Sequence, residues 1–269
     1  MENPENIRLV VFFGMLVMMG SAESIWGARL WETGRLRRWF WHGLWSIFNT
    51  LWTRILIFTP FVIWLSWVES RQWGIARWLG LRGGLEILIT ILAYDAYNYW
   101  WHRLNHEWTW LWRFHQVHHM DTHVDVTTAL RFHPGELLIA YGAKAIWVLV
   151  WGPSLAAFVI TEMTITAYAQ FHHANIDFPD AFEKGLRKLH VTPRLHASHH
   201  TVTRRTRDAN YSTIFTLWDY LFGSYREPDR HEMQQLGLPE GRTSYLKLPA
   251  MFWLPFTQRG DEKDMKKSD

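Results

Sequence analysis

The stretch that decides the fold is YDAYNYWWHRLNHEWTWLWRFHQVHH, residues 94–119. It carries His102 and His106 four residues apart, followed by the triplet His115, His118 and His119. Because an α-helix repeats every 3.6 residues, positions i, i+3 and i+4 share a face, so each group can point its imidazoles into one space. The stretch therefore predicts helices that hold a metal site between them.

Two further histidine groups follow this stretch. A second His-x-x-His-His motif ends at residue 200, and the pair His172 and His173 lies between the two motifs. Imidazole suits Zn, Fe, Cu and Ni, and one such ion offers about four to six ligand positions. We therefore expect two metal ions rather than one. The candidate ligands are His102, His106, His115, His118, His119, His173, His196, His199 and His200, with His172 left open.

The remaining histidines include four that stand apart from these helical groups. A single histidine is more often a core or surface residue than a ligand, and we expect that role for His42, His123, His190 and His231.

Composition narrows the classes of protein. The 269 residues suit one large domain, and no stretch resembles a flexible linker, so we treat 1–269 as a single unit. Cysteine is absent, which excludes disulfides, thiolate zinc sites, iron–sulfur clusters and a cysteine nucleophile within this sequence. The formal charge of +3 is small and its basic residues form no stripe, which gives nucleic acid binding little support.

Long apolar segments predict a membrane protein. Residues 9–22 carry no charge and residues 39–68 carry only Arg54 apart from a histidine, and many of the 19 tryptophans lie at the ends of such runs, as in an interfacial aromatic belt. A third segment begins near Gly84. The fourth, residues 137–171, is interrupted by Gly152 and Pro153 and suits two helical passes.

Charge sets the expected orientation. Four arginines between the first two segments assign that loop to the cytoplasm, and counting passes then puts all three histidine regions on the cytoplasmic side. The absence of cysteine and of a readable targeting signal favours a bacterial inner membrane, with the endoplasmic reticulum as the alternative. The charged tail at 260–269 is expected to be disordered.

Carboxylates near the histidines are candidates to support the ligands, because a metal-bound imidazole usually donates its second nitrogen to an oxygen. Asp95 shares a helical stripe with Tyr99, His102 and His106, and a carboxylate in a lipid-embedded segment is costly unless paired. The other candidates near the histidine groups are Asp121, Glu136, Asn175, Asp208 and Asp219.

These motifs resemble the fatty acid hydroxylase and sterol desaturase superfamily of integral-membrane diiron enzymes. The resemblance covers about 84–225 and rests on residues 94–119 together with TALRFHPGE, QFHHAN, TPRLHASHH and NYSTIFTLWDYLFGSY. It implies a membrane-embedded helical bundle under a cytoplasmic cap that holds two irons. It also implies that O2 and electrons from a separate ferredoxin-, cytochrome b5- or reductase-type donor oxidise a C–H bond of a lipid by hydroxylation or desaturation.

The resemblance assigns the same nine histidines as iron ligands, although zinc can replace iron during purification because it binds imidazole more tightly. It places His133 beside Arg131 and Glu136 in an RxHPxE element, where we expect a supporting role. Some members carry a further histidine four residues before the His172–His173 pair, and here Tyr168 and Ala169 occupy those positions. One metal therefore has one fewer protein ligand, or His172 supplies it.

Two other classes remain as alternatives. A membrane hydrolase could use two zinc ions to activate water, although such sites usually include bridging carboxylates. A metal transporter or haem-binding electron carrier could also use histidine, but haem needs only one or two axial ligands.

Overall fold

The computed structural model describes residues 4–30, 34–238 and 247–257. Within these ranges the chain is helical and contains only three isolated β-bridges, so the predicted all-α class is confirmed. The tail predicted to be disordered, 260–269, lies outside the described residues.

The amino-terminal part forms α1 (Pro4–Ile25) and a long, bent run of helix. This run consists of α2 (Arg35–Thr53), a π-helical segment (Arg54–Phe58) and α3 (Thr59–Ser70), followed by the short α4 (Ile75–Trp78). Pro60 sits in the first turn of α3 and has no N–H to donate to the preceding turn, which accounts for the looser π-helical hydrogen bonding just before it. The apolar segments predicted at 9–22 and 39–68 both lie within these helices.

The histidine-bearing helices follow. Helix α5 (Gly83–Glu107) and α6 (Thr109–His119) are separated by Trp108, whose extended backbone (φ −100°, ψ 109°) turns the chain between the first two histidine groups. Helices α7 (Pro134–Trp151) and α8 (Leu155–His173) meet at Gly152, as predicted. Gly152 adopts a φ of 69°, and an added Cβ would lie 1.8 Å from the Trp73 carbonyl oxygen, so only glycine fits.

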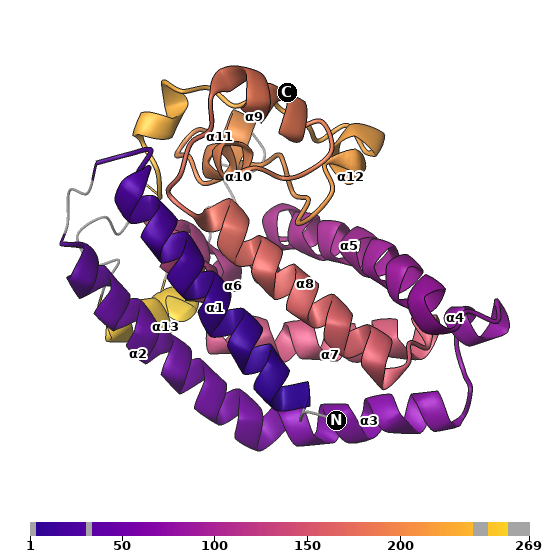
Figure 1. The fold of residues 1–269 in the computed structure, drawn as a ribbon. Helices are drawn as coiled ribbons and strands as arrows, with labels where there is room; N and C mark the ends of the chain where they lie inside the picture. Colours follow the sequence, from indigo (N-terminus) through magenta and orange to yellow (C-terminus); the bar gives the residue numbers. More distant parts are fainter. Residues whose placement is uncertain (1–3, 31–33, 239–246, 258–269) are drawn as a thin grey trace.

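Apolar contacts join these helices into one body. Phe61 and Leu65 of α3 pack with Tyr94 of α5, Val148 of α7 and Phe158 of α8. A second cluster joins α2 and α6 to α13 (Leu248–Thr257), and a third joins α1 to the end of α8. Figure 1 shows α1, α8 and α5 running alongside one another, with α2 and α3 along one edge.

Short helices form a cap at one end of this bundle (Figure 1). They are α9 (Asp180–Leu186), α10 (Pro193–His199), α11 (Arg204–Arg207) and α12 (Leu217–Leu221), and two 3-10 turns occupy Val126–Leu130 and Glu232–Gln234. Helices α5 and α8 end beneath the cap, which brings their terminal histidines to α10.

Two described stretches are long and apolar enough to cross a membrane by length and composition: Asn6–Ile25 and Arg35–Trp78. Their outward faces expose apolar side chains, among them Val10 (71% exposed), Val17 (66%) and Ile55 (73%). Helices α5, α7 and α8, predicted from their apolar residues as further passes, are not among these stretches, and their passage through a membrane stays a prediction.

Candidate metal centre

Nine histidines converge from four helices into two groups. In each group the ligand nitrogens lie within 4.8 Å of one another. We call them the five-histidine group (His102, His106, His115, His119 and His199) and the four-histidine group (His118, His173, His196 and His200). The first His-x-x-His-His motif contributes to both groups, and so does the second. Helices α6 and α10 therefore each place imidazole nitrogens in both groups, so the two candidate metal positions are neighbours.

The tautomers of His102 and His199 leave two lone pairs facing each other. His102 donates Nδ1–H to the Tyr211 carbonyl (2.9 Å), and His199 donates Nδ1–H to the Ala209 carbonyl (2.7 Å). A neutral imidazole carries one N–H, so both Nε2 atoms are unprotonated, yet they lie 3.0 Å apart. The two lone pairs repel each other unless a cation lies between them. The arrangement therefore fits a metal ion bound by both nitrogens.

The four-histidine group shows the same convergence. His173 donates Nδ1–H to the Ala169 carbonyl (2.6 Å), which leaves its Nε2 unprotonated. That atom lies 2.9 Å from Nε2 of His196 and 3.1 Å from Nε2 of His118. The donor set again fits a metal that prefers nitrogen ligands.

Burial keeps these imidazoles neutral. Loss of solvation, followed by the neighbouring imidazoles, holds the pKa of His118 and His119 well below the ordinary value. The pKa of His173 falls to about 4, again mainly because of burial. Neutral imidazole is the form that binds metals, so the site is prepared for ligation at neutral pH.

Two of the carboxylates proposed as supports contact imidazoles. Glu136 accepts a hydrogen bond from Nδ1 of His115 (2.7 Å), and Asp208 lies 3.3 Å from Nδ1 of His106. The other supports are backbone carbonyls of residues 169, 209 and 211, which sequence reasoning missed. Every residue has a carbonyl, so no sequence signal could have identified them.

Asp95 contacts the ligand imidazoles only indirectly, through a loop. Its carboxylate accepts hydrogen bonds from the backbone N–H groups of Ile214 and Phe215 and from the indole of Trp218. It therefore holds the loop at 211–215, and this loop carries the Tyr211 carbonyl that accepts from His102. Asp219 anchors the same loop through the N–H groups of residues 211 and 212.

The three remaining proposed supports hold segments of the chain together rather than ligand imidazoles: Asp121 pairs with Arg38 of α2, and the other two are His133 and Asn175. Nδ1 of His133 accepts from the N–H of Gly135 at the start of α7, and its Nε2–H donates to the Phe252 carbonyl of α13. Asn175 receives Arg29 N–H and donates to the Arg29 carbonyl, which fixes the end of α8 against the segment after α1.

His172 stands beside the four-histidine group but outside it. Its Nδ1–H donates to the Thr213 carbonyl (3.1 Å), and its ring centre lies 4.0 Å from that of His196. Its Nε2 is therefore unprotonated and lies in the wall of a cavity that adjoins the site. As for the isolated histidines, His42 is buried against Thr127 and Arg131, away from both groups.

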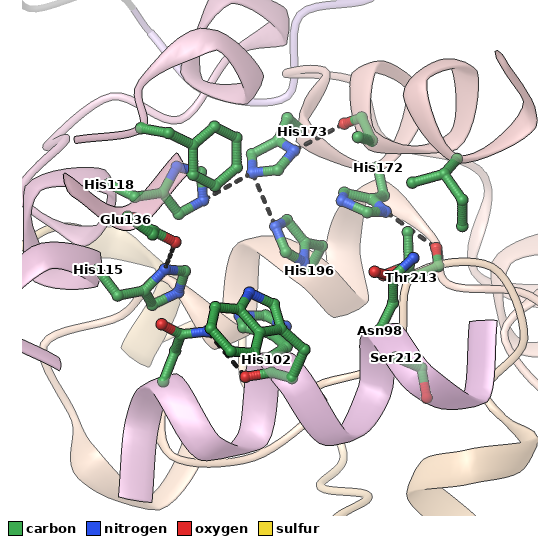
Figure 2. Close-up of a pocket in the computed structure, with 15 residues that line it drawn as sticks. Asn98, His102, His115, His118, Glu136, His172, His173, His196, Ser212 and Thr213 are labelled. Atoms are coloured by element: carbon green, nitrogen blue, oxygen red, sulfur yellow. Dashed lines mark hydrogen bonds and ion pairs between the residues drawn. The ribbon is translucent and has the colours of Figure 1, made fainter. Parts of the chain in front are cut away.

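A cavity of about 160 Å³ opens beside both histidine groups. Figure 2 shows Glu136 and His115 on one side of it, Asn98 and Ser212 on the other, and His102 and His196 between them. Its apolar lining comes from Trp101, Phe132, Ile165 and Ala169. A small organic group could therefore lie in this cavity beside the two histidine groups.

The fatty acid hydroxylase family matches residues 87–224, just over half of the chain. The chain belongs to the fatty acid hydroxylase family. The match contains all nine histidines of the two groups as well as Asp95 and Asp219. The family resemblance expected from the motifs is thereby confirmed.

Curated proteins similar to this chain are named for different activities. Ornithine lipid hydroxylase OlsE of Rhizobium tropici is 29% identical over 65% of this chain and 51% of its own length. Very-long-chain aldehyde decarbonylase GL1-10 of Oryza sativa subsp. japonica is 31% identical over 61% of this chain and 57% of its own. Alkylglycerol monooxygenase of Danio rerio is 30% identical over 51% of this chain and 30% of its own length.

This chain thus spans little more than half the length of the relatives it matches, and less for the monooxygenase. No solved structure matches the chain.

Proposed function

We propose that this protein is a membrane-bound oxygenase that uses two iron ions, O2 and external electrons to hydroxylate a lipid. The observation that carries the proposal is the facing pair of unprotonated nitrogens on His102 and His199, 3.0 Å apart within the five-histidine group and next to the four-histidine group. The names of the relatives, a lipid hydroxylase and a monooxygenase among them, support lipid oxidation.

The reaction converts a C–H bond, O2, two electrons and two protons into a C–OH group and one water. Desaturation would consume the same oxidant and electrons and release two waters. Bound iron ions would supply the electron transfer that O2 requires, whereas zinc has no redox chemistry. The chain itself supplies neutral imidazoles, carbonyls that fix their tautomers, and a cavity that adjoins them.

The membrane arrangement is part of the proposal. The exposed apolar faces of α1, α2 and α3 suit contact with lipid chains, because soluble proteins rarely expose such continuous apolar surfaces. All nine histidines lie at the cap end of the bundle, where Arg29 donates to the Val124 carbonyl and Arg38 of α2 pairs with Asp121. The positive-inside rule then assigns the cap to the cytoplasmic side, where a ferredoxin-, cytochrome b5- or reductase-type donor can reach it.

The hydrolase alternative is less well supported by the site. Both ligand groups consist of histidines alone within the described residues, without a carboxylate that could bridge two zinc ions. The nearest carboxylates, Glu136 and Asp208, instead contact the Nδ1 atoms of His115 and His106. Lipid turnover that continues without O2 would favour the hydrolase.

The test of the metal site is metal content with Mössbauer spectroscopy of protein grown in iron-57. Two coupled irons per chain are expected in the wild type, with loss of coupling in His199→Ala and in His118→Ala, one variant for each group. The control is His231→Ala, which changes an exposed histidine far along the chain from both motifs. One iron or none in the wild type, or unchanged spectra in both variants, would refute the site.

A further inference from the structure

The cavity beside the histidines carries an unusual set of polar atoms. Three lining side chains are at least 95% buried and hold an oxygen with no hydrogen-bond partner among the described residues: Oδ1 of Asn105, Oε2 of Glu136 and Oγ of Ser212. Nδ2 of Asn98, in the same lining, also has no partner. We call these four side chains the polar wall.

These atoms are costly without a ligand. A buried polar group without a partner destabilises a protein, and proteins satisfy nearly all such groups. Four in one small cavity indicate that something else completes them. The cavity could hold about five waters at about 30 Å³ each, or a short segment of a ligand.

Three of the four free atoms of the polar wall can accept from a hydrogen-bond donor, whereas Nδ2 of Asn98 donates and needs an acceptor such as a carbonyl oxygen. The free oxygens of Asn105 and Glu136 can only accept, and the hydroxyl of Ser212 can either accept or donate. Glu136 also uses its other oxygen to accept from His115, so a side chain that lines the cavity beside a candidate ligand has one oxygen left to accept. An ester or ether oxygen only accepts, so it could not satisfy Asn105 or Glu136.

The apolar part of the lining fits the rest of a lipid. Trp101, Phe132, Ile165 and Ala169 line the same cavity, and five of its lining histidines belong to the two ligand groups. A molecule bound here would therefore hold carbon next to the metals while its polar end contacts the polar wall. Figure 2 shows the two ends of this wall on opposite sides of His102 and His196.

We propose that the substrate is a lipid with a hydroxyl or amide N–H group close to the carbon that reacts, and that the polar wall recognises this group. The inference rests on the proposed function and narrows its substrate class. Recognition of donors would exclude plain methylene segments and donor-free esters, because each would leave buried acceptors unpaired.

The test compares two lipids of the same shape. N-Hexadecanoylethanolamine carries one N–H and one O–H near its carbonyl, and propyl hexadecanoate replaces them by an ester oxygen and a methyl group. Each is titrated as a mixed micelle into zinc-loaded protein, and affinity is measured by calorimetry as a mole fraction. Zinc makes the protein inert towards O2, so binding is measured independently of any oxidation.

We expect the wild type to prefer the hydroxyamide by about tenfold to a hundredfold, the range that one or two unpaired acceptors produce. The conservative Ser212→Ala and the isosteric Asn105→Leu should each reduce this preference at least about threefold while retaining two zinc ions per chain. Using two variants protects the test against misfolding in one of them.

Equal affinity of the wild type for the two lipids, or a preference that both zinc-replete variants retain, would overturn the inference. The proposed function fails separately, if the iron-loaded protein with O2 and reductant oxidises no lipid. If the iron-loaded protein oxidised lipids with and without a hydrogen-bond donor equally well, the proposed function would stand. Only recognition by the polar wall would be refuted.

Discussion

Arg38 and Asp121 form a fully buried ion pair that joins α2 to the residue two positions after the first His-x-x-His-His motif. The guanidinium donates from Nη1 to Oδ1 (2.5 Å) and from Nη2 to Oδ2 (3.0 Å) of Asp121, and it also reaches Asp125 (3.1 Å). Burial by itself would raise the pKa of Asp121, but Arg38, with His42 and Arg131, outweighs burial and holds that pKa well below its usual range. The pair therefore fixes the end of α6, which carries His118 and His119, against the amino-terminal helices.

Replacing Arg38 with Met should destabilise the protein strongly. The change leaves Asp121 and Asp125 buried without their main positive partner, and breaking a buried pair in this way costs about 3–5 kcal/mol. The measurement is the free energy of unfolding in detergent. Arg37→Met is the control, because Arg37 is exposed at the next position of the same helix and should change stability by less than about 0.5 kcal/mol. Equal effects of the two substitutions would contradict this role of Arg38.

His172 and His173 should differ in their effect on metal binding. His173→Ala removes a member of the four-histidine group and should reduce the metal content from two ions towards one. His172→Ala should keep two ions, because His172 lies outside both groups and bonds to the Thr213 carbonyl. Metal analysis after gel filtration distinguishes the two. Loss of a metal ion from His172→Ala would make His172 a ligand.

Asp95→Asn should weaken metal binding without touching a ligand. Asparagine has one acceptor oxygen, so it cannot keep the three hydrogen bonds that Asp95 receives from Ile214, Phe215 and Trp218. The loop would then hold the Tyr211 carbonyl less firmly against His102, and such indirect supports are worth about 10–100-fold in metal affinity. Zinc competition with a chelator measures this effect.

The control for Asp95 lies on the same helix. Glu107→Gln changes an exposed carboxylate that pairs with Arg103, and it should leave zinc affinity within about twofold of the wild type. If Asp95→Asn matched this control, the loop would not depend on Asp95.

The metal-free protein should lose stability as the pH falls below about 6.5. In the unfolded chain the imidazoles titrate near 6.5, whereas burial lowers the pKa of His118, His119 and His200 well below that value and that of His173 to about 4. The unfolded state then binds more protons, so the free energy of unfolding falls with decreasing pH between about 6.5 and 4 and is unaffected by these groups above that window.

The measurement is chemical unfolding of chelator-treated protein across this pH range. Zinc-loaded protein is the comparison, since bound metal competes with protons for the same nitrogens and should move the loss to lower pH. A flat profile for the metal-free protein would show that the imidazoles are not buried in the neutral form.

Much of the helical framework could be predicted because it depends on local features. The apolar runs at 9–22 and 39–68, and the Gly152–Pro153 break between α7 and α8, are visible in the order of residues and recur in the structure. The histidine groups could be predicted for the same reason, since residues three and four apart share a helical face. The membrane crossing, the ligand roles and the identity of the metals stay predictions.

The sequence by itself determined which histidines can act together within each helix, because helical spacing is a local property. Only the tertiary structure decided how they divide: neighbouring His118 and His119 point to different groups, while His102 meets His199 across 97 positions of the chain. It also decided that carbonyls fix the tautomers, that Asp95 holds a loop rather than an imidazole, and that Arg38 pairs with Asp121. These contacts join residues about 80 to 120 positions apart, and packing of distant helices rather than local spacing brings them together.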